Sequence, residues 1–210
     1  MSTGIGIFTR VPVAGATKTR LIPLLGAEGA ARAHVQLLGL ALQAAGQACP
    51  GAVTVFVAGD VRHLVLPSRL PGLVPVREQE GADLGERMAR ALQSLWAGHE
   101  RALVIGSDCA VITAGVLREA ALALQDHDLV FVPAEDGGYV LVGARRGTPR
   151  LAQVFRDVPW STAEVMAATR QRVQEAGLRH AELATLWDVD EPADWQRAVA
   201  AGLVRDDAAS

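Results

Sequence analysis

At residues 103–109 the chain reads Leu103-Val104-Ile105-Gly106-Ser107-Asp108-Cys109, an apolar run that stops at a small residue, a hydroxyl and a carboxylate. A short apolar run bounded by glycine is typical of a strand buried on both faces, as in parallel sheets covered by helices. We therefore expect Asp108 at the carboxyl end of such a strand, the edge where open α/β sheets bind ligands. A carboxylate there can hold a divalent metal against a phosphate, or it can solvate a loop.

The patterns on either side of this run alternate between strand and helix. Further buried strands are expected at residues 4–9, 52–58, 73–77, 128–132 and 140–143. Helices are expected at 26–48 and 113–125, with two more that end near residues 98 and 175 and one that begins at about Pro192. This alternation predicts an α/β fold, a three-layer sandwich with a mostly parallel central sheet and helices on both faces.

Length and composition set the outer limits. The 210 residues predict a single domain over 1–204 and a disordered tail at 205–210. The net charge of −3 and the lack of a basic stripe argue against a nucleic-acid partner. The two cysteines are far apart in sequence and cannot build a four-ligand metal site by themselves. Such sparse use of cysteine is typical of a protein in a reducing compartment. The start of the chain lacks signal-peptide features and no run is long enough to cross a membrane, so we expect a cytoplasmic protein without a membrane partner.

The loop after the first strand contains the only lysine of the chain, Lys18. Pro12 and Gly15 interrupt regular structure there, and Lys18 and Arg20 supply two cations. Such a loop can wrap a phosphate with backbone N–H groups and cations, although it also fits a solvated turn. In the helix at 26–48, His34 is expected to be a surface or partly buried residue without a catalytic role.

Three later stretches carry polar or aromatic residues at predicted turns. The glycines Gly81 and Gly85 permit close approach of a flat nucleotide base, or simply a tight turn. The carboxylate of Asp136 precedes two glycines and can point at a substrate or belong to a hairpin turn. If residues 188–190 are extended, Asp188 and Asp190 point to opposite faces, so one of them at most reaches a given metal.

The order of these motifs closely resembles the DUF2064 family, from about residue 4 to 200. The motifs are Arg-x-Pro-x-x-Gly-x-x-Lys-Thr-Arg-Leu at 10–21, the loop at 81–88, Gly-Ser-Asp-Cys at 106–109, Pro-Ala-Glu-Asp-Gly-Gly-Tyr at 133–139, Pro-Trp-Ser-Thr at 159–162 and Asp-Val-Asp-Glu-Pro-Ala-Asp at 188–194. This family is described as glycosyltransferase-like, with the GT-A nucleotide-diphospho-sugar transferase fold, and some members are labelled arsenosugar biosynthesis glycosyltransferases. The chain departs from the usual pattern at Arg10, Ala14 and Ala110, where Lys, Pro and Pro are common.

The resemblance implies roles for the residues that match its motifs. Mg²⁺ or Mn²⁺ would be held on a diphosphate by carboxylates, and the nucleotide would be bound by the first loop and the glycine loop. The implied metal ligands are Asp108 with Asp188 or Asp190, and the implied nucleotide-binding residues are Arg10, Gly15, Lys18, Arg20, Gly81 and Gly85. Lys18 and Arg20 would also stabilise the leaving group, and Asp136 would contact the sugar or act as general base. Trp160 and Tyr139 would line the acceptor side.

Three functions fit these residues. The first is a metal-dependent glycosyltransferase that moves a sugar from a nucleoside diphosphate-sugar to a small-molecule acceptor. The second is a nucleotidyltransferase, because the motifs also look like those of the guanylyltransferase that activates phospholactate or phosphoenolpyruvate in deazaflavin cofactor synthesis. The third is a nucleotide-binding module without catalysis, against which the many acids beside a phosphate argue. The sugar, base, acceptor, stereochemical course and oligomeric state stay open.

Overall fold

The computed structural model describes residues 2–64 and 74–205 and contains a seven-stranded sheet in the order β3-β2-β1-β4-β6-β5-β7. The strand β6 runs antiparallel to both of its neighbours, and all other neighbouring strands pair in parallel. The strands are β1 Thr3–Arg10, β2 Val53–Ala58, β3 Val76–Glu78, β4 Arg101–Gly106, β5 Leu129–Pro133, β6 Tyr139–Arg145 and β7 His180–Glu182. The predicted mostly parallel sheet is therefore confirmed.

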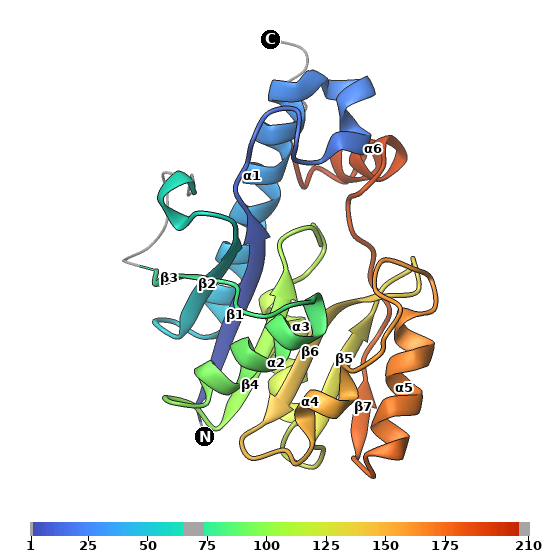
Figure 1. Cartoon of the computed structure of the whole chain (residues 1–210). Coiled ribbons are helices and arrows are strands. Elements are labelled where there is room, and N and C mark those ends of the chain that lie inside the picture. Colours follow the sequence, from blue (N-terminus) through green and yellow to red (C-terminus); the bar gives the residue numbers. More distant parts are fainter. Residues whose placement is uncertain (1, 65–73, 206–210) are drawn as a thin grey trace.

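Helices cover both faces of this sheet (Figure 1). On one face pack α1 (Ile22–Ala48) and α3 (Ala114–Ala123), and on the other α2 (Leu84–Leu95), α4 (Leu151–Val154) and α5 (Val165–Glu175). The last helix, α6 (Pro192–Ala200), packs with the first half of α1 beyond the carboxyl ends of the parallel strands (Figure 1). Two short 3-10 helices, η1 (Thr19–Leu21) and η2 (Val61–His63), follow β1 and β2. The three-layer α/β sandwich is thus confirmed.

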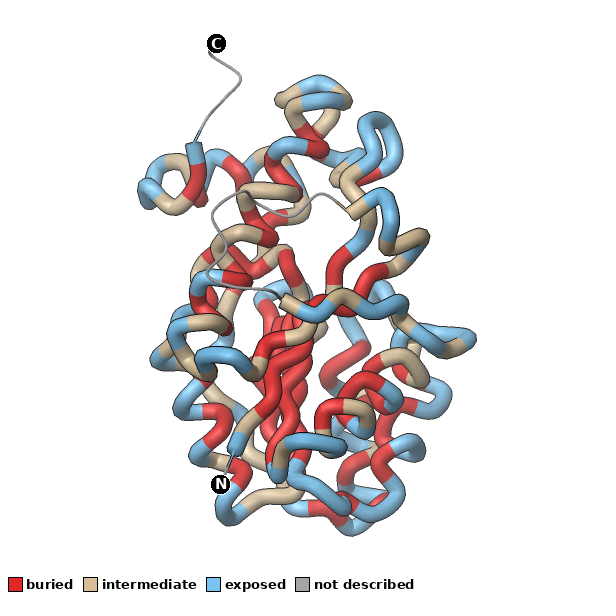
Figure 2. Tube along the Cα trace, turned by 90° about the vertical axis from the view of Figure 1, so that its left-hand side faces the viewer, coloured by how far each residue is buried: buried red, intermediate tan, exposed pale blue. Residues whose placement is uncertain are grey.

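The core lies on the central strands, which form a continuous buried block in the tube view (Figure 2). In β4 every residue from Arg101 to Ile105 is buried, and the chain first reaches partial exposure at Gly106. This burial explains why β4 reads as an unbroken apolar run. No helix in the described part of the chain is long and apolar enough to cross a membrane.

Several elements differ from the sequence-based expectation. The third strand begins at Val76, and residue 73 of the expected strand lies outside the described residues, as do residues 206–210 of the expected disordered tail. The chain also forms α4 and β7, which were not predicted. The hairpin interpretation of the turn around Asp136 is confirmed, because β5 and β6 pair antiparallel and a hydrogen bond from the N–H of Ala134 to the carbonyl of Gly138 closes the turn.

The strand order creates a switch point between β1 and β4. In the sheet, β1 lies between β2 and β4. The chain that leaves β1 continues to β2 on one side of it, and β4 pairs with its other side. Loops that leave neighbouring strands in different directions open a crevice at the carboxyl ends of those strands. The loop that carries Lys18 and the turn that carries Asp108 begin at this crevice.

Candidate functional site

The loop between β1 and η1 is folded around a buried hydroxyl. The Thr17 Oγ1 accepts a hydrogen bond from the N–H of Val13 and donates one to the carbonyl of Val11, each at 3.0 Å. The next residue, Lys18, has a left-handed backbone with φ of 49°. This geometry directs the Lys18 side chain inward, and its side chain is only 5% exposed.

The Lys18 ammonium lies among oxygen atoms from two distant parts of the chain. Its Nζ is 3.0 Å from Asp108 Oδ2 and 3.6 Å from Asp190 Oδ1, and it donates to the carbonyl of Val189. Asp190 also forms an ion pair with Arg20. One buried cation therefore joins the end of β4 to the segment before α6.

The segment at 186–190 is held along the edge of the crevice by backbone hydrogen bonds. The N–H of Val189 donates to the Asp108 carbonyl at 2.9 Å, and the N–H of Leu186 donates to the Pro133 carbonyl at 2.9 Å. Beyond it, α6 begins with a capping box formed by Glu191 and Asp194. These contacts bring Asp188 and Asp190 to the same site as Asp108.

Asp188 lies in an acidic environment. The pKa of Asp188 is raised to about 6. Burial is the largest cause, and the negative charges of Asp136 and Asp108 act in the same direction. Asp136 itself is held by the N–H of Gly138, which donates to its Oδ1 at 2.9 Å. Asp108, Asp136 and Asp188 thus lie together in one part of the site. Asp108 pairs with Lys18, and Asp190 pairs with both Lys18 and Arg20.

No three histidine, cysteine, aspartate or glutamate side chains within residues 2–64 and 74–205 are arranged as a metal site by themselves. A divalent cation would therefore need ligand oxygens, such as those of a phosphate, in addition to the carboxylates of the chain. The donor set fits this requirement, because the mutual repulsion of Asp108, Asp136 and Asp188 is relieved by an added cation.

His34 differs from its sequence-based expectation. Its side chain is 3% exposed, and it lies at the site rather than on the surface of α1. The Nε2 is 2.9 Å from the Thr9 Oγ1, and the Nδ1 is 3.8 Å from Asp108 Oδ1. Burial lowers the pKa of His34, with Asp108 acting in the opposite direction. A lone histidine in an apolar helical pattern carries no local signal that would have predicted this position.

Two pockets meet at these residues. The loop pocket, of about 230 Å³, is lined by Arg10, Ala16, Thr17, Lys18, Thr19, Arg20, His34, Asp108 and Asp190. The central pocket, of about 570 Å³, is lined by Arg20, Leu84, Met88, Asp108, Ala134, Asp136, Gly138, Tyr139, Trp160, Ser161, Thr162, Ala163, Val165, Asp188 and Asp190. Asp108, Asp190 and Arg20 line both pockets. One pocket is rich in cations and the other in carboxylates and apolar side chains.

Aromatic rings form one wall of the central pocket. The rings of Tyr139 and Trp160 pack edge to face with centroids 6.5 Å apart. The Tyr139 hydroxyl is buried beside Thr169 of α5, and this burial raises its pKa above the ordinary value. Tyr139 therefore presents its ring to the pocket, whereas its hydroxyl faces the core.

Neither Gly81, in the turn before α2, nor Gly85, in the first turn of α2, lines the loop pocket or the central pocket. A Cβ at Gly85 would lie 2.7 Å from atoms of Phe155 and Trp160, and one at Gly81 would lie 2.8 Å from the backbone nitrogen of Arg87. Gly85 allows the first turn of α2 to pack against Phe155 and Trp160, and Gly81 allows the preceding turn to lie against Glu86 and Arg87. Their geometry accords with the tight-turn interpretation. Gly15 has φ of +81° in the lysine loop and likewise does not line the loop pocket.

We predict that Gly85→Ala lowers the free energy of unfolding by about 1–3 kcal/mol, because the new methyl group meets a backbone oxygen of Phe155 that cannot rotate away. Urea unfolding measures this change. Gly46→Ala in α1 is the matched control, since its Cβ has open space and alanine favours the helix by up to about 1 kcal/mol. Equal stability of the two variants would contradict the packing role.

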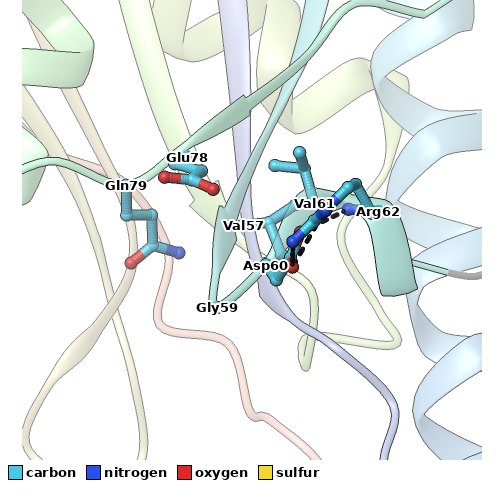
Figure 3. Close-up of a pocket in the computed structure, with 7 residues that line it drawn as sticks. All are labelled: Val57, Gly59, Asp60, Val61, Arg62, Glu78 and Gln79. Carbon is cyan, nitrogen blue, oxygen red and sulfur yellow. Dashed lines mark hydrogen bonds and ion pairs between the residues drawn. The ribbon is translucent and has the colours of Figure 1, made fainter.

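A third hollow, the edge pocket, lies at the carboxyl ends of β2 and β3 (Figure 3). Its lining includes Asp60, whose carboxylate forms an ion pair with Arg62, and Gln79. The Gln79 Nε2 donates to the carbonyls of Thr9 and Phe56, both at 3.0 Å. The edge pocket thus adjoins β1 and is lined by neither Lys18 nor Asp108.

Comparisons with solved structures place this architecture among transferases. A protein from Desulfovibrio desulfuricans G20, described as a candidate nucleotide-diphospho-sugar transferase, is 29% identical. The match covers 91% of this chain and 84% of that protein's chain, with a TM-score of 0.77. A nucleotidyl transferase from Methanothermobacter thermautotrophicus is 18% identical, with coverage of 95% and 97% and a TM-score of 0.62. Rv0371c from Mycobacterium tuberculosis H37Rv, solved in complex with manganese, is 18% identical, with coverage of 94% and 97% and a TM-score of 0.54. The last two show the fold alone.

A search of curated proteins finds no match. A family model does match, over residues 41–162, and its description is an uncharacterized protein conserved in bacteria, DUF2064. That match spans more than half of the chain and includes the turn with Asp108, the hairpin with Asp136 and the loop with Trp160. The chain therefore belongs to the DUF2064 family.

Proposed function

We propose that the chain is a metal-dependent glycosyltransferase that moves a sugar from a nucleoside diphosphate-sugar to a small-molecule acceptor. The observation that carries this proposal is the meeting of two unlike pockets at Asp108, one lined by cations and one by carboxylates and aromatic rings. A nucleoside diphosphate-sugar has two chemically different parts that match these pockets. Its charged diphosphate suits the cations, and its hydroxyl-rich sugar suits the carboxylates and aromatic rings.

The loop pocket suits the diphosphate. Arg10, Lys18 and Arg20 line it, and their charges favour the negative charge that develops on the leaving diphosphate. The base would extend from Arg10 toward the edge pocket, where the Gln79 amide is oriented by two backbone carbonyls. In this proposal Gly85 lets α2 pack against Trp160, and Gly81 shapes the turn before α2.

The carboxylates suit a divalent cation on the diphosphate. Asp108 and Asp188 would hold Mg²⁺ or Mn²⁺ together with phosphate oxygens, and the bound ion would neutralise charge on the leaving group. Asp190 would keep Lys18 and Arg20 in place through its ion pairs. Asp136, which lies with Asp108 and Asp188 in the central pocket, would contact the sugar or accept the proton of the acceptor hydroxyl.

The composition of the central pocket favours sugar transfer over nucleotidyl transfer. Among its described lining residues Arg20 is the only cation, and Asp190 already pairs with it. A phosphorylated acid, the acceptor that the nucleotidyltransferase alternative requires, would bring two more anionic groups to this wall. A hydroxyl-bearing acceptor instead matches Asp136 and the ring of Trp160, since carboxylates accept hydroxyl hydrogen bonds and aromatic rings pack on apolar faces.

Thermal unfolding in the presence of nucleotides tests the proposal. We expect one nucleoside diphosphate or its sugar conjugate to raise the stability of the chain only when Mn²⁺ or Mg²⁺ is present. The expected gain is about 2.7 kcal/mol at a ligand concentration 100-fold above its Kd. Asp108→Asn is the control and should abolish the metal-dependent part of the gain. Stabilisation by triphosphates alone would favour the nucleotidyltransferase, and no stabilisation by any nucleotide would contradict both.

A further inference from the structure

His34 stands out among the buried polar residues because one of its ring nitrogens has no evident partner. The side chain is 3% exposed and belongs to α1, yet it lines the loop pocket. Its Nδ1 forms no hydrogen bond with any described residue. A buried ring nitrogen without a partner costs stability, so its retention beside Asp108 needs an explanation.

The two ring nitrogens have different surroundings. The Nε2 is 2.9 Å from the Thr9 hydroxyl oxygen and 3.2 Å from the carbonyl oxygen of Arg10. The Nδ1 faces Asp108, with 3.8 Å between the nitrogen and Oδ1. The other carboxylate oxygen, Oδ2, is 3.0 Å from the Lys18 ammonium. Asp108 therefore lies between His34 and Lys18, one at each oxygen.

The neighbours of the ring select one of its two neutral tautomers. With the proton on Nε2, the bare lone pair of Nδ1 would face the carboxylate of Asp108, so two acceptors would be opposed in a buried place. With the proton on Nδ1, the Thr9 hydroxyl donates to Nε2 and the Nδ1–H points at Asp108. This form leaves the Nε2 lone pair 3.2 Å from the carbonyl oxygen of Arg10. A bare lone pair is repelled more strongly by the full charge of the Asp108 carboxylate than by a neutral carbonyl, so the form with the proton on Nδ1 is favoured.

We infer that His34 is a positioning residue, which in its Nδ1–H form donates toward Asp108 Oδ1 and, with Lys18 at Oδ2, fixes the orientation of the Asp108 carboxylate for its ligand. The 3.8 Å between Nδ1 and Oδ1 is longer than a hydrogen bond, and the Asp108 side chain, which is 39% exposed, has room to turn toward the ring. This inference rests on the proposed function only for what Asp108 then binds. The orientation of Asp108 itself can be tested without any ligand.

The tautomer is read directly by long-range ¹H–¹⁵N correlation NMR of the imidazole ring in the full-length protein. We expect the spectrum of His34 to show a protonated Nδ1 and an unprotonated Nε2. Thr9→Val keeps the shape of the side chain but removes the hydroxyl donor, which leaves the Arg10 carbonyl as the only partner of Nε2. We expect this variant to move the proton to Nε2. A wild-type ring protonated at Nε2 would overturn the inference.

Two substitutions separate positioning from packing. Asparagine can place its amide nitrogen near the position of Nδ1, whereas glutamine can place its own near Nε2. We therefore expect His34→Gln, which keeps the Thr9 side, to weaken the affinity for Mn²⁺ alone by roughly tenfold or more, the effect of one lost hydrogen bond to a charged group. His34→Asn, which keeps the Asp108 side, should retain Mn²⁺ affinity to within a few fold. A purely structural His34 predicts the opposite order.

Crystal structures of the metal-free variants complete the test. In His34→Gln the Asp108 carboxylate should turn away from its wild-type orientation, and in His34→Asn it should keep that orientation. If the wild-type chain binds no Mn²⁺, the proposed metal dependence fails, but the tautomer and the Asp108 orientation still decide the role of His34. An unchanged Asp108 in both variants would overturn that role.

Discussion

Replacement of Lys18 by alanine is expected to reduce the proposed transferase rate by about 10²-fold to 10³-fold, the range found when one preorganised donor to a developing charge is removed. The Lys18 ammonium is almost completely buried and lies within 3.6 Å of two carboxylates, Asp108 and Asp190, that are far apart in the sequence. Its loss removes a cation from the loop pocket and leaves Asp108 without its partner at Oδ2. Release of the nucleoside diphosphate over time measures the rate.

Lys18→Arg is the matched control for charge. A planar guanidinium is larger than an ammonium and does not fit between Asp108, Asp190 and the Val189 carbonyl, so we expect this variant to remain impaired. Because Lys18 is the only lysine, an amine-specific acylating reagent can modify only this side chain and the N-terminal amine. Nucleotide should slow acylation of Lys18 and leave acylation of the N-terminal amine unchanged. Full activity of Lys18→Ala would refute a role for this cation.

Asp188→Asn is expected to stabilise the metal-free chain at neutral pH. The folded-state pKa of Asp188 is about 6, against an ordinary value of 3.8, so the folded chain holds a proton that the unfolded chain releases. This contribution to stability is complete below pH 3.8 and is lost as the pH rises through 6. Asparagine cannot ionise and avoids that loss, so we expect a gain of about 2 kcal/mol above pH 7, after allowance for partial exposure.

Urea unfolding in the presence of a chelator measures this gain at pH 4.5 and pH 7.5. The difference between Asp188→Asn and wild type should be small at the lower pH and larger at the higher one. Mn²⁺ should then stabilise wild type more than the variant, because the variant lacks a carboxylate. Asp190→Asn is the control, since Asp190 faces Lys18 and Arg20 and its loss removes attractive pairs. A gain that does not depend on pH would argue against a raised pKa at Asp188.

The parts of the fold that follow from local pattern could be predicted from the sequence. The apolar run that ends at Asp108 is a buried strand because its neighbours cover both faces, and the cap at Thr113 accepts the N–H of Val116 as its position suggests. The strand β7 could not be predicted, because three residues without an apolar pattern form a strand only through pairing with β5. This segment becomes a strand because β5 offers it backbone hydrogen-bonding partners, which its own sequence does not indicate.

Of the candidate site, only the proximity of Lys18 and Asp108 could be predicted from the sequence. Lys18 and Asp108 follow strands whose ends must meet, so their proximity follows from the parallel arrangement. The pairing of Asp190 with cations and the buried position of Asp188 depend on the path of the segment before α6, which has no strand pattern. His34 reaches the site from the middle of a helix, and its neighbours there are set by tertiary packing alone.

The Lys18 side chain and the Val189 carbonyl that it contacts are 171 positions apart, so this contact closes nearly the whole chain into one loop. Local contacts within the sheet and helices form at lower entropic cost, and a contact of this sequence separation is gained only when both ends have already been brought together. A partly folded chain that keeps most of the sheet but has released the segment before α6 would lose the Val189 and Asp190 partners of Lys18 and keep only Asp108. Binding of the proposed ligand would therefore be coupled to completion of folding, and local unfolding of residues 186–200 would remove part of the site while most of the core persists.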